Sequence, residues 1–230
     1  MRHGRGVRVV SELIALVVPP ACVVCRAALP RVELRLCAEC TRALPWLAAR
    51  VCRRCGLPSH RRGCPAASAA FARAWAPLAY DGVARELVAA LKFRAALPVA
   101  ALMAAHIAAN LPGDLRAPAV LVPVPPQRAR TRRRGFDPAA QLTSHLAARL
   151  ALPQAACLRR RDHGRPQVGA TRRERRRAGR LAIELRAPPP PRVLLVDDVH
   201  TTGATLDACA RALRAGGCEE VTAITYARTL

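Results

Sequence analysis

Three cysteine pairs of the same form follow one another near the start of the chain and restrict what this region can fold into. Two residues separate the members of each pair, and a seventh cysteine follows: Cys22-x2-Cys25, Cys37-x2-Cys40, Cys52-x2-Cys55 and Cys64. Two thiolates at this spacing can turn back on one metal ion in a tight knuckle, and two knuckles close a tetrahedral site. The pattern predicts a zinc ribbon with structural Zn²⁺, and its first ligand set is Cys22, Cys25, Cys37 and Cys40.

The second ligand set contains only three thiolates. His60 is the candidate for the fourth ligand, beside Cys52, Cys55 and Cys64, although a lone histidine in a loop is usually only solvated. The sequence leaves open whether one or two zinc ions bind. A disulfide scaffold is an alternative, but it needs an oxidising compartment, and nothing in the sequence indicates secretion. A redox CxxC site is another alternative, but it would need one pair rather than three.

The chain shows no transmembrane segment. The apolar run that starts at Leu13 is broken by Pro19 and Pro20 and is too short to cross a bilayer. No small-residue cleavage site follows it, which argues against a signal peptide. We therefore expect residues 7–18 to form an amphipathic helix and the protein to be cytoplasmic.

The alternation of apolar runs and turn residues predicts an α/β fold. Helical spacing indicates helices over 83–93, 99–111, 138–152 and 204–217, and short apolar runs indicate strands at 119–125, 192–199 and 220–230. Asp137 should cap the third helix, and residues 126–141 otherwise read as a basic loop that turns at Gly135. We expect a mostly parallel sheet flanked by helices over residues 71–230, preceded by the helix and zinc ribbon of residues 1–70.

Two adjacent acids end one of these strands, in the stretch VLLVDDVHTTGAT at residues 193–205. Ligands of open parallel sheets bind outside the carboxyl ends of the strands. The helix that starts after Gly203 offers backbone N–H groups to a phosphate, and three threonines add hydroxyls. Asp197 and Asp198 would repel that phosphate and instead suit a neighbouring diol or a divalent cation. A ribose 5-phosphate meets both needs, although an acid at a strand end also occurs in α/β proteins that bind no such ligand.

This stretch resembles the phosphoribosyl-pyrophosphate (PRPP) signature of type I phosphoribosyltransferases. The order of cysteine knuckles, YDGVARELVAALKFR, LVPVP…RRRGFDPAAQL, RPQVG and the signature is similar to the ComF family. These are competence-associated, phosphoribosyltransferase-like proteins of bacteria with a double zinc ribbon. The resemblance extends from about Pro19 to Leu230.

The resemblance implies a role for each part of the site. Asp197 and Asp198 would hold the ribose hydroxyls, and Mg²⁺ would bridge these hydroxyls and the pyrophosphate of PRPP. Lys92 and the loop around Arg134 would lie near the pyrophosphate, and Arg159–Arg180 would occupy the place of the mobile hood that closes over such sites. The 5′-phosphate would be cradled by Thr201, Thr202, Gly203, Ala204 and Thr205.

Three positions depart from the family pattern. Ala178 stands where members often carry Asn, and Ala67 stands where a fourth cysteine would complete the last knuckle. Thr201 stands where purine-salvage enzymes of the superfamily carry an Asp that acts on the base. A 6-oxopurine salvage enzyme is therefore disfavoured, and the sequence indicates no catalytic general base.

The charge of the chain favours a polyanionic partner. The net charge is +23, and Lys92 is the single lysine among 38 basic residues. Residues 125–180 contain 16 arginines and three acids, so single-stranded DNA could bind through Arg128–Arg134 and Arg159–Arg180. Phe136 is the one aromatic residue there, and a solvated basic face remains an alternative.

Two functions of different classes fit this sequence. The first is PRPP-dependent transfer of a ribosyl phosphate to an unidentified acceptor, linked to natural competence and DNA uptake. The second is a non-catalytic adaptor that keeps the fold, binds single-stranded DNA and contacts other competence proteins.

Overall fold

The computed structural model describes residues 20–48, 50–60, 63–116, 119–161 and 182–230. The expected helix at 7–18 and most of the expected hood lie outside these residues.

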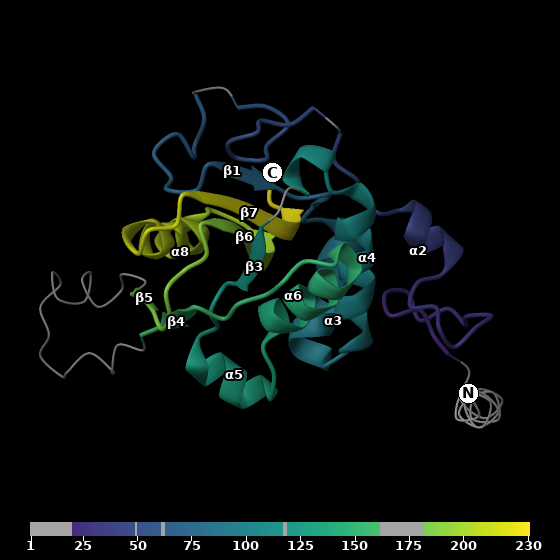
Figure 1. Cartoon of the computed structure of the whole chain (residues 1–230). Coiled ribbons are helices and arrows are strands. Elements are labelled where there is room, and N and C mark those ends of the chain that lie inside the picture. The colour runs from purple at the N-terminus through teal and green to yellow at the C-terminus, as the bar shows by residue number, and fades with distance from the viewer. Residues whose placement is uncertain (1–19, 49, 61–62, 117–118, 162–181) are drawn as a thin grey trace, which may run out of the picture.

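Five parallel strands form the sheet at the centre of the molecule (Figure 1). Their path is β1-β7-β6-β3, and β2 pairs with β7 farther along. The bounds are β1 Arg73–Trp75, β2 Leu78–Ala79, β3 Val120–Pro123, β6 Arg192–His200 and β7 Glu220–Arg228. The expected parallel α/β sheet is confirmed. The strands β1 and β2 were missed because three and two residues, separated by a proline, carry no periodic signal.

Helices cover both faces of the sheet because successive strand residues point to opposite sides. In β6, Leu194 and Val196 pack in one core with α3, α4 and α6, while Val193 and Leu195 pack in a second core with α8. Figure 1 shows α8 on the opposite side of the sheet from the other three helices. The helix bounds are α3 Gly82–Arg94, α4 Pro98–Asn110, α6 Pro138–Leu150 and α8 Ala204–Ala215.

Helix ends follow the residues that favour them. The Asp137 carboxylate caps α6 by accepting a hydrogen bond from the Ala139 N–H at 3.0 Å, as expected, and α8 ends at Gly216. The expected loop after β3 is wrong in part, because Arg128–Arg134 forms the helix α5. This helix ends at Gly135, whose φ of 79° is a conformation that glycine adopts readily.

Two short strands, one near each end of the segment expected to form the hood, make a second, small sheet. The strands β4 (Leu158–Arg160) and β5 (Ile183–Leu185) pair antiparallel. The mobile hood expected over Arg159–Arg180 therefore begins within a strand, because Arg159 and Arg160 belong to β4. The exposed side of this pair is tied by ion pairs from Arg159 and Arg161 to Glu184.

The cysteine-rich region packs onto the same two cores rather than standing apart. Cys22, Leu29 and Leu36 belong to the core under α3 and α4, and Cys55 belongs to the core under α8. The region contains one short helix, α2 (Ala38–Arg42), and is otherwise built of knuckle turns.

Candidate functional site

An open cleft lies at the carboxyl ends of β3 and β6, where ligands of parallel sheets bind. The acidic pair Asp197 and Asp198 belongs to β6 itself, since this strand continues to His200. Thr201 and Thr205 follow from the turn before α8. Lys92 and Arg134 reach the same cleft from α3 and α5, so residues far apart in the sequence meet at one site.

The two acids have different surroundings. The Asp198 carboxylate is almost fully buried and accepts a 2.6 Å hydrogen bond from the Lys92 ammonium. Asp197 accepts a 2.8 Å hydrogen bond from the Asp198 N–H. Burial and the neighbouring Asp198 carboxylate raise the pKa of Asp197 to about 8, so this acid readily holds a proton near neutral pH.

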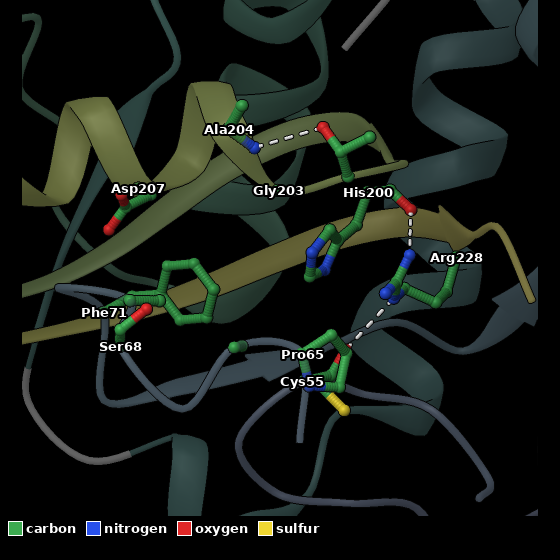
Figure 2. Close-up of a pocket in the computed structure, with 12 residues that line it drawn as sticks. Cys55, Pro65, Ser68, Phe71, His200, Gly203, Ala204, Asp207 and Arg228 are labelled. Atoms are coloured by element: carbon green, nitrogen blue, oxygen red, sulfur yellow. Dashed lines mark hydrogen bonds between the residues drawn. The ribbon is translucent and has the colours of Figure 1, made fainter. Parts of the chain in front are cut away.

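The turn between β6 and α8 faces two different cavities. Thr201 and Thr205 line the cleft that holds the acids. Thr202, Gly203 and Ala204 line a second cavity beneath the turn, on the side of the cysteine-rich region (Figure 2). The five residues expected to cradle the phosphate therefore divide between the two cavities. The backbone N–H groups at the start of α8 remain the common element.

Gly203 is required by the shape of this turn. Its φ is 81°, and a Cβ added there would lie 2.8 Å from Nε2 of His200. His200 is buried, and burial together with the charge of Arg228 lowers its pKa to about 4. The imidazole is thus neutral and supports the turn from below.

Further basic residues, which the sequence did not single out one by one, complete the cleft. Arg130 and Arg160 line it together with Arg134, whose guanidinium lies 5.2 Å from the centre of the exposed Phe93 ring. Asp137 also lines the cleft, and burial raises its pKa. Its role as a helix cap was visible in the sequence, but its place beside the acidic pair depends on how α6 packs on β6.

The seven clustered cysteines form two groups with the geometry of zinc sites. The ligand atoms of each group lie within 4.8 Å of one another, in the sets Cys22, Cys25, Cys37, Cys40 and Cys52, Cys55, His60, Cys64. Sulfur atoms bound tetrahedrally at about 2.3 Å from zinc lie about 3.8 Å apart. The distances of 3.6 Å between Cys25 and Cys37 and 3.9 Å between Cys52 and Cys64 fit this value. The donor sets therefore fit structural zinc.

His60 completes the second group, as the sequence suggested. Its side chain lowers the pKa of the Cys52 thiol to about 6. A thiol that ionises this readily is prepared to act as a metal ligand, because the thiolate is the binding form. The remaining cysteines, Cys157, Cys209 and Cys218, are buried and belong to neither group.

Among the residues that the structure describes, no helix is long and apolar enough to cross a membrane.

Comparisons with known proteins agree with this architecture. The model of the double zinc ribbon domain matches residues 13–70, and that of the phosphoribosyl transferase domain matches residues 132–229. Over 113 residues the chain is 36% identical to competence protein F of Haemophilus influenzae. This match covers 47% of the chain and 49% of the relative, so the chain spans about half the length of the curated relative that it matches.

The solved structures that match include orotate phosphoribosyltransferase from Aeropyrum pernix. The match has a TM-score of 0.33 and 21% identity, and covers 61% of this chain and 62% of that chain. The two domain models and the competence protein together confirm the resemblance stated from the sequence.

Proposed function

We propose, from the premise that the chain is a ComF-family protein with a phosphoribosyltransferase domain, that its cleft binds PRPP together with Mg²⁺. The observation that carries the proposal is the meeting of Asp197 and Asp198 with Lys92, Arg134 and the start of α8 in one cleft.

The charge layout supports PRPP as the ligand. The two carboxylates would accept hydrogen bonds from the ribose hydroxyls. The 5′-phosphate would bind the N–H groups at the start of α8, and Thr201 and Thr205 would add hydroxyl donors. Lys92 and Arg134, which both line the cleft, would neutralise the pyrophosphate. The residues fit Mg²⁺ as well, because carboxylate oxygens and phosphates are the ligands it prefers.

We propose ribosyl phosphate transfer as the reaction. The bond between C1′ and the pyrophosphate oxygen would break while a nucleophilic atom of the acceptor bonds to C1′. The cationic side chains of the cleft would stabilise the charge that develops on the leaving pyrophosphate, and bound Mg²⁺ would supply further charge neutralisation. Thr201 offers no carboxylate to an acceptor base, which argues against 6-oxopurine acceptors.

The test is calorimetry of PRPP with Mg²⁺ on the wild type and on the Asp197→Asn, Asp198→Asn double variant. We expect binding to the wild type and none to the variant, with zinc content unchanged. Equal affinity in both proteins would reject the ribose assignment. Pyrophosphate release in the presence of candidate acceptors, including nucleic acid, separates transfer from binding alone.

Single-stranded DNA binding by a non-catalytic adaptor is the second candidate, and the exposed arginines beside the cleft favour it. Arg132 and Arg133 lie on the exposed side of α5, and Arg159 and Arg161 are exposed on β4 and just after it. A basic surface of this kind binds the phosphate backbone without reading sequence. Replacing Arg132 and Arg133 by Gln should lower the slope of log affinity against log salt concentration by about 1.4 if both contact phosphates. An unchanged slope would remove α5 from the DNA surface.

The cellular role and the domain boundary are two further proposals. We propose that the protein acts in the cytoplasm during natural competence, in contact with other competence proteins, and that a domain boundary lies near residue 70. The similarity to competence protein F supports the role in competence, and the start of β1 at Arg73 supports the boundary. Limited proteolysis of the zinc-loaded chain tests the boundary.

A further inference from the structure

Arg228, at the end of β7, carries a buried positive charge with an unusual set of partners. Its Nε donates to the carbonyl of Cys55 at 3.0 Å, and its Nη1 donates to the carbonyls of His200 at 2.8 Å and Thr229 at 2.9 Å. Nη1 also donates to the carbonyl of Thr201. Within the described part of the chain, no carboxylate forms an ion pair with this guanidinium. The acceptors of these four hydrogen bonds are all backbone oxygens.

Such an arrangement holds backbone carbonyls in place rather than neutralising an acidic side chain. Burying a guanidinium without a counter-ion is costly, and charge-assisted hydrogen bonds to four carbonyls offset that cost only if all four stay in place. These carbonyls belong to the knuckle of the second cysteine group and to the turn that opens α8, besides the carboxyl-terminal residues (Figure 2). The side chain thus joins a zinc ligand residue directly to the signature turn.

A second connection joins the cysteine-rich region to the first turns of α8. Asp207, in its first turn, accepts a 2.7 Å hydrogen bond from the Ala70 N–H. Arg211 donates to the same Asp207 carboxylate at 3.0 Å and to the Ser68 carbonyl at 3.2 Å. The segment that follows Cys64 is therefore attached to the end of α8 where the phosphate is proposed to bind.

The knuckle is also held close to the sheet. Gly56 has a φ of 73°, and a Cβ there would lie 3.3 Å from the Ala74 carbonyl in β1. The ring of His200 lies between Gly203 and Phe71, 6.1 Å from the Phe71 ring centre. Around these contacts, the cavity of Figure 2 leaves space beneath the turn. The position of the turn relative to that cavity therefore depends on the hydrogen bonds from the cysteine-rich region.

We infer that Arg228 is a positioning residue that transmits the state of the second zinc group, Cys52, Cys55, His60 and Cys64, to the phosphate-binding turn at residues 200–205. The inference rests on the PRPP site proposed above. Metal binding would fix the Cys55 carbonyl, Arg228 would hold the turn against it, and the N–H groups at the start of α8 would be kept in register for the phosphate. Without that metal, the cleft would keep its acids and cations but bind phosphate more weakly.

A double-mutant cycle on the full, zinc-loaded chain tests this coupling. The variants are His60→Ala, Arg228→Gln and the combination, and calorimetry measures their dissociation constants for PRPP with Mg²⁺. We expect each single change to weaken binding by roughly 10-fold, and the double variant to be within about 2-fold of the weaker single variant. Single effects that multiply to roughly 100-fold would overturn the inference, because they would show independent actions.

Matched controls separate positioning from general damage. Arg192→Gln removes an exposed arginine at the other end of β6, where it pairs with Glu220, and should leave PRPP affinity unchanged. Zinc content should be two per chain in Arg228→Gln and one in His60→Ala. If Arg228→Gln does not fold, Arg228→Lys keeps the charge with fewer hydrogen bonds, and we expect it to weaken binding less than 10-fold while remaining coupled to His60→Ala.

Hydrogen exchange supplies a readout that needs no ligand. The amides of residues 200–205 should exchange faster in His60→Ala than in the wild type, and this acceleration should disappear in the Arg228→Gln background. If the wild type fails to bind PRPP, the proposed function fails, yet this measurement still tests the coupling. Unchanged exchange at the turn in both single variants would overturn it.

Discussion

The ammonium nitrogen of Lys92 lies 2.6 Å from Oδ1 of Asp198, and this ion pair joins the last turn of α3 to the end of β6. It places the single lysine of the chain at the one acidic spot of a basic cleft. The cation and the carboxylate are thus held side by side, within reach of the phosphate and hydroxyl groups of one ligand.

Lys92→Met should weaken binding of PRPP with Mg²⁺ by roughly 10-fold or more and lower the free energy of unfolding by about 1–2 kcal/mol. The buried Asp198 carboxylate would lose its cationic partner, and the partial exposure of Lys92 keeps the stability loss below that of a fully buried pair. Calorimetry and urea unfolding measure the two effects. Arg85→Met, an exposed change on the same helix, should alter neither; equal losses in both variants would refute the pairing argument.

Asp197 makes stability depend on pH above the range in which most acids titrate. Its pKa is raised to about 8 by burial and by Asp198, whereas an unfolded Asp ionises near 4. Between these values the folded chain holds a proton that the unfolded chain has lost, so stability falls as pH rises. From pH 6.5 to 8.5 the wild type should lose about 2 kcal/mol relative to Asp197→Asn in urea unfolding.

The comparison with Asp197→Asn removes other titrations from this result. The zinc ligands are the same in both proteins. His200, whose pKa is lowered to about 4 in the folded chain, regains an ordinary pKa near 6.5 on unfolding, and this difference is the same in both proteins. Parallel stability curves for the two proteins would contradict a raised pKa at Asp197.

Binding of PRPP with Mg²⁺ should release a proton at pH 7 and strengthen as pH rises from 7 to 9. Ribose hydroxyls donate hydrogen bonds to a carboxylate, so the ligand favours ionised Asp197, which is mostly protonated beforehand. Calorimetry in buffers of different ionisation enthalpy measures the protons released. Asp197→Asn should release fewer, and an unchanged count would assign the proton to another group.

Gly203→Ala should abolish detectable PRPP binding and destabilise the chain by about 2 kcal/mol or more. The added Cβ would meet Nε2 of His200 at 2.8 Å, and the φ of 81° is unfavourable for alanine. Gly217→Ala is the matched control, because its φ is 100° but nothing lies within 4 Å of its Cβ. That variant should show only the backbone cost of about 1 kcal/mol and normal binding; similar behaviour of both would exclude the contact with His200.

The wild type should contain two zinc ions per chain, and Cys25→Ser or Cys64→Ser should each remove one. The two groups share no ligand, so each metal should be lost independently. Metal analysis of protein purified without chelator gives the count, and Cys157→Ala, outside both groups, should retain two ions. One zinc in the wild type would restrict the metal to a single group.

The elements that the sequence predicted best are those whose signal is local. The continuous burial of Val193–Val196, the Asp137 cap and the Gly216 end each depend on residues close together in the sequence, and all three are present. The helix α5 was missed because Arg128–Arg134 has no apolar side that would set a helical period.

The residues of the site also divide into those with a local sequence signal and those without one. Asp197, Asp198 and the turn up to Thr205 are contiguous, so their spacing alone predicts that they share an edge of the sheet. Arg130, Arg160 and Asp137 were not individually predicted to line the cleft, since nothing in their own segments indicates that α5, β4 and α6 meet at this edge. Their assembly depends on contacts between elements that are distant in sequence.

The sequence by itself determined the metal-binding knuckles, the parallel α/β fold and the acidic signature, because each depends on residue type at short, fixed spacing. Only the tertiary structure decided that Lys92 pairs with Asp198 and that Arg228 connects Cys55 to the signature turn. The physical reason is that a side chain chooses its partner by where packing of the sheet and helices places it. The core that brings β7, the knuckle and α8 together is formed by residues throughout the chain.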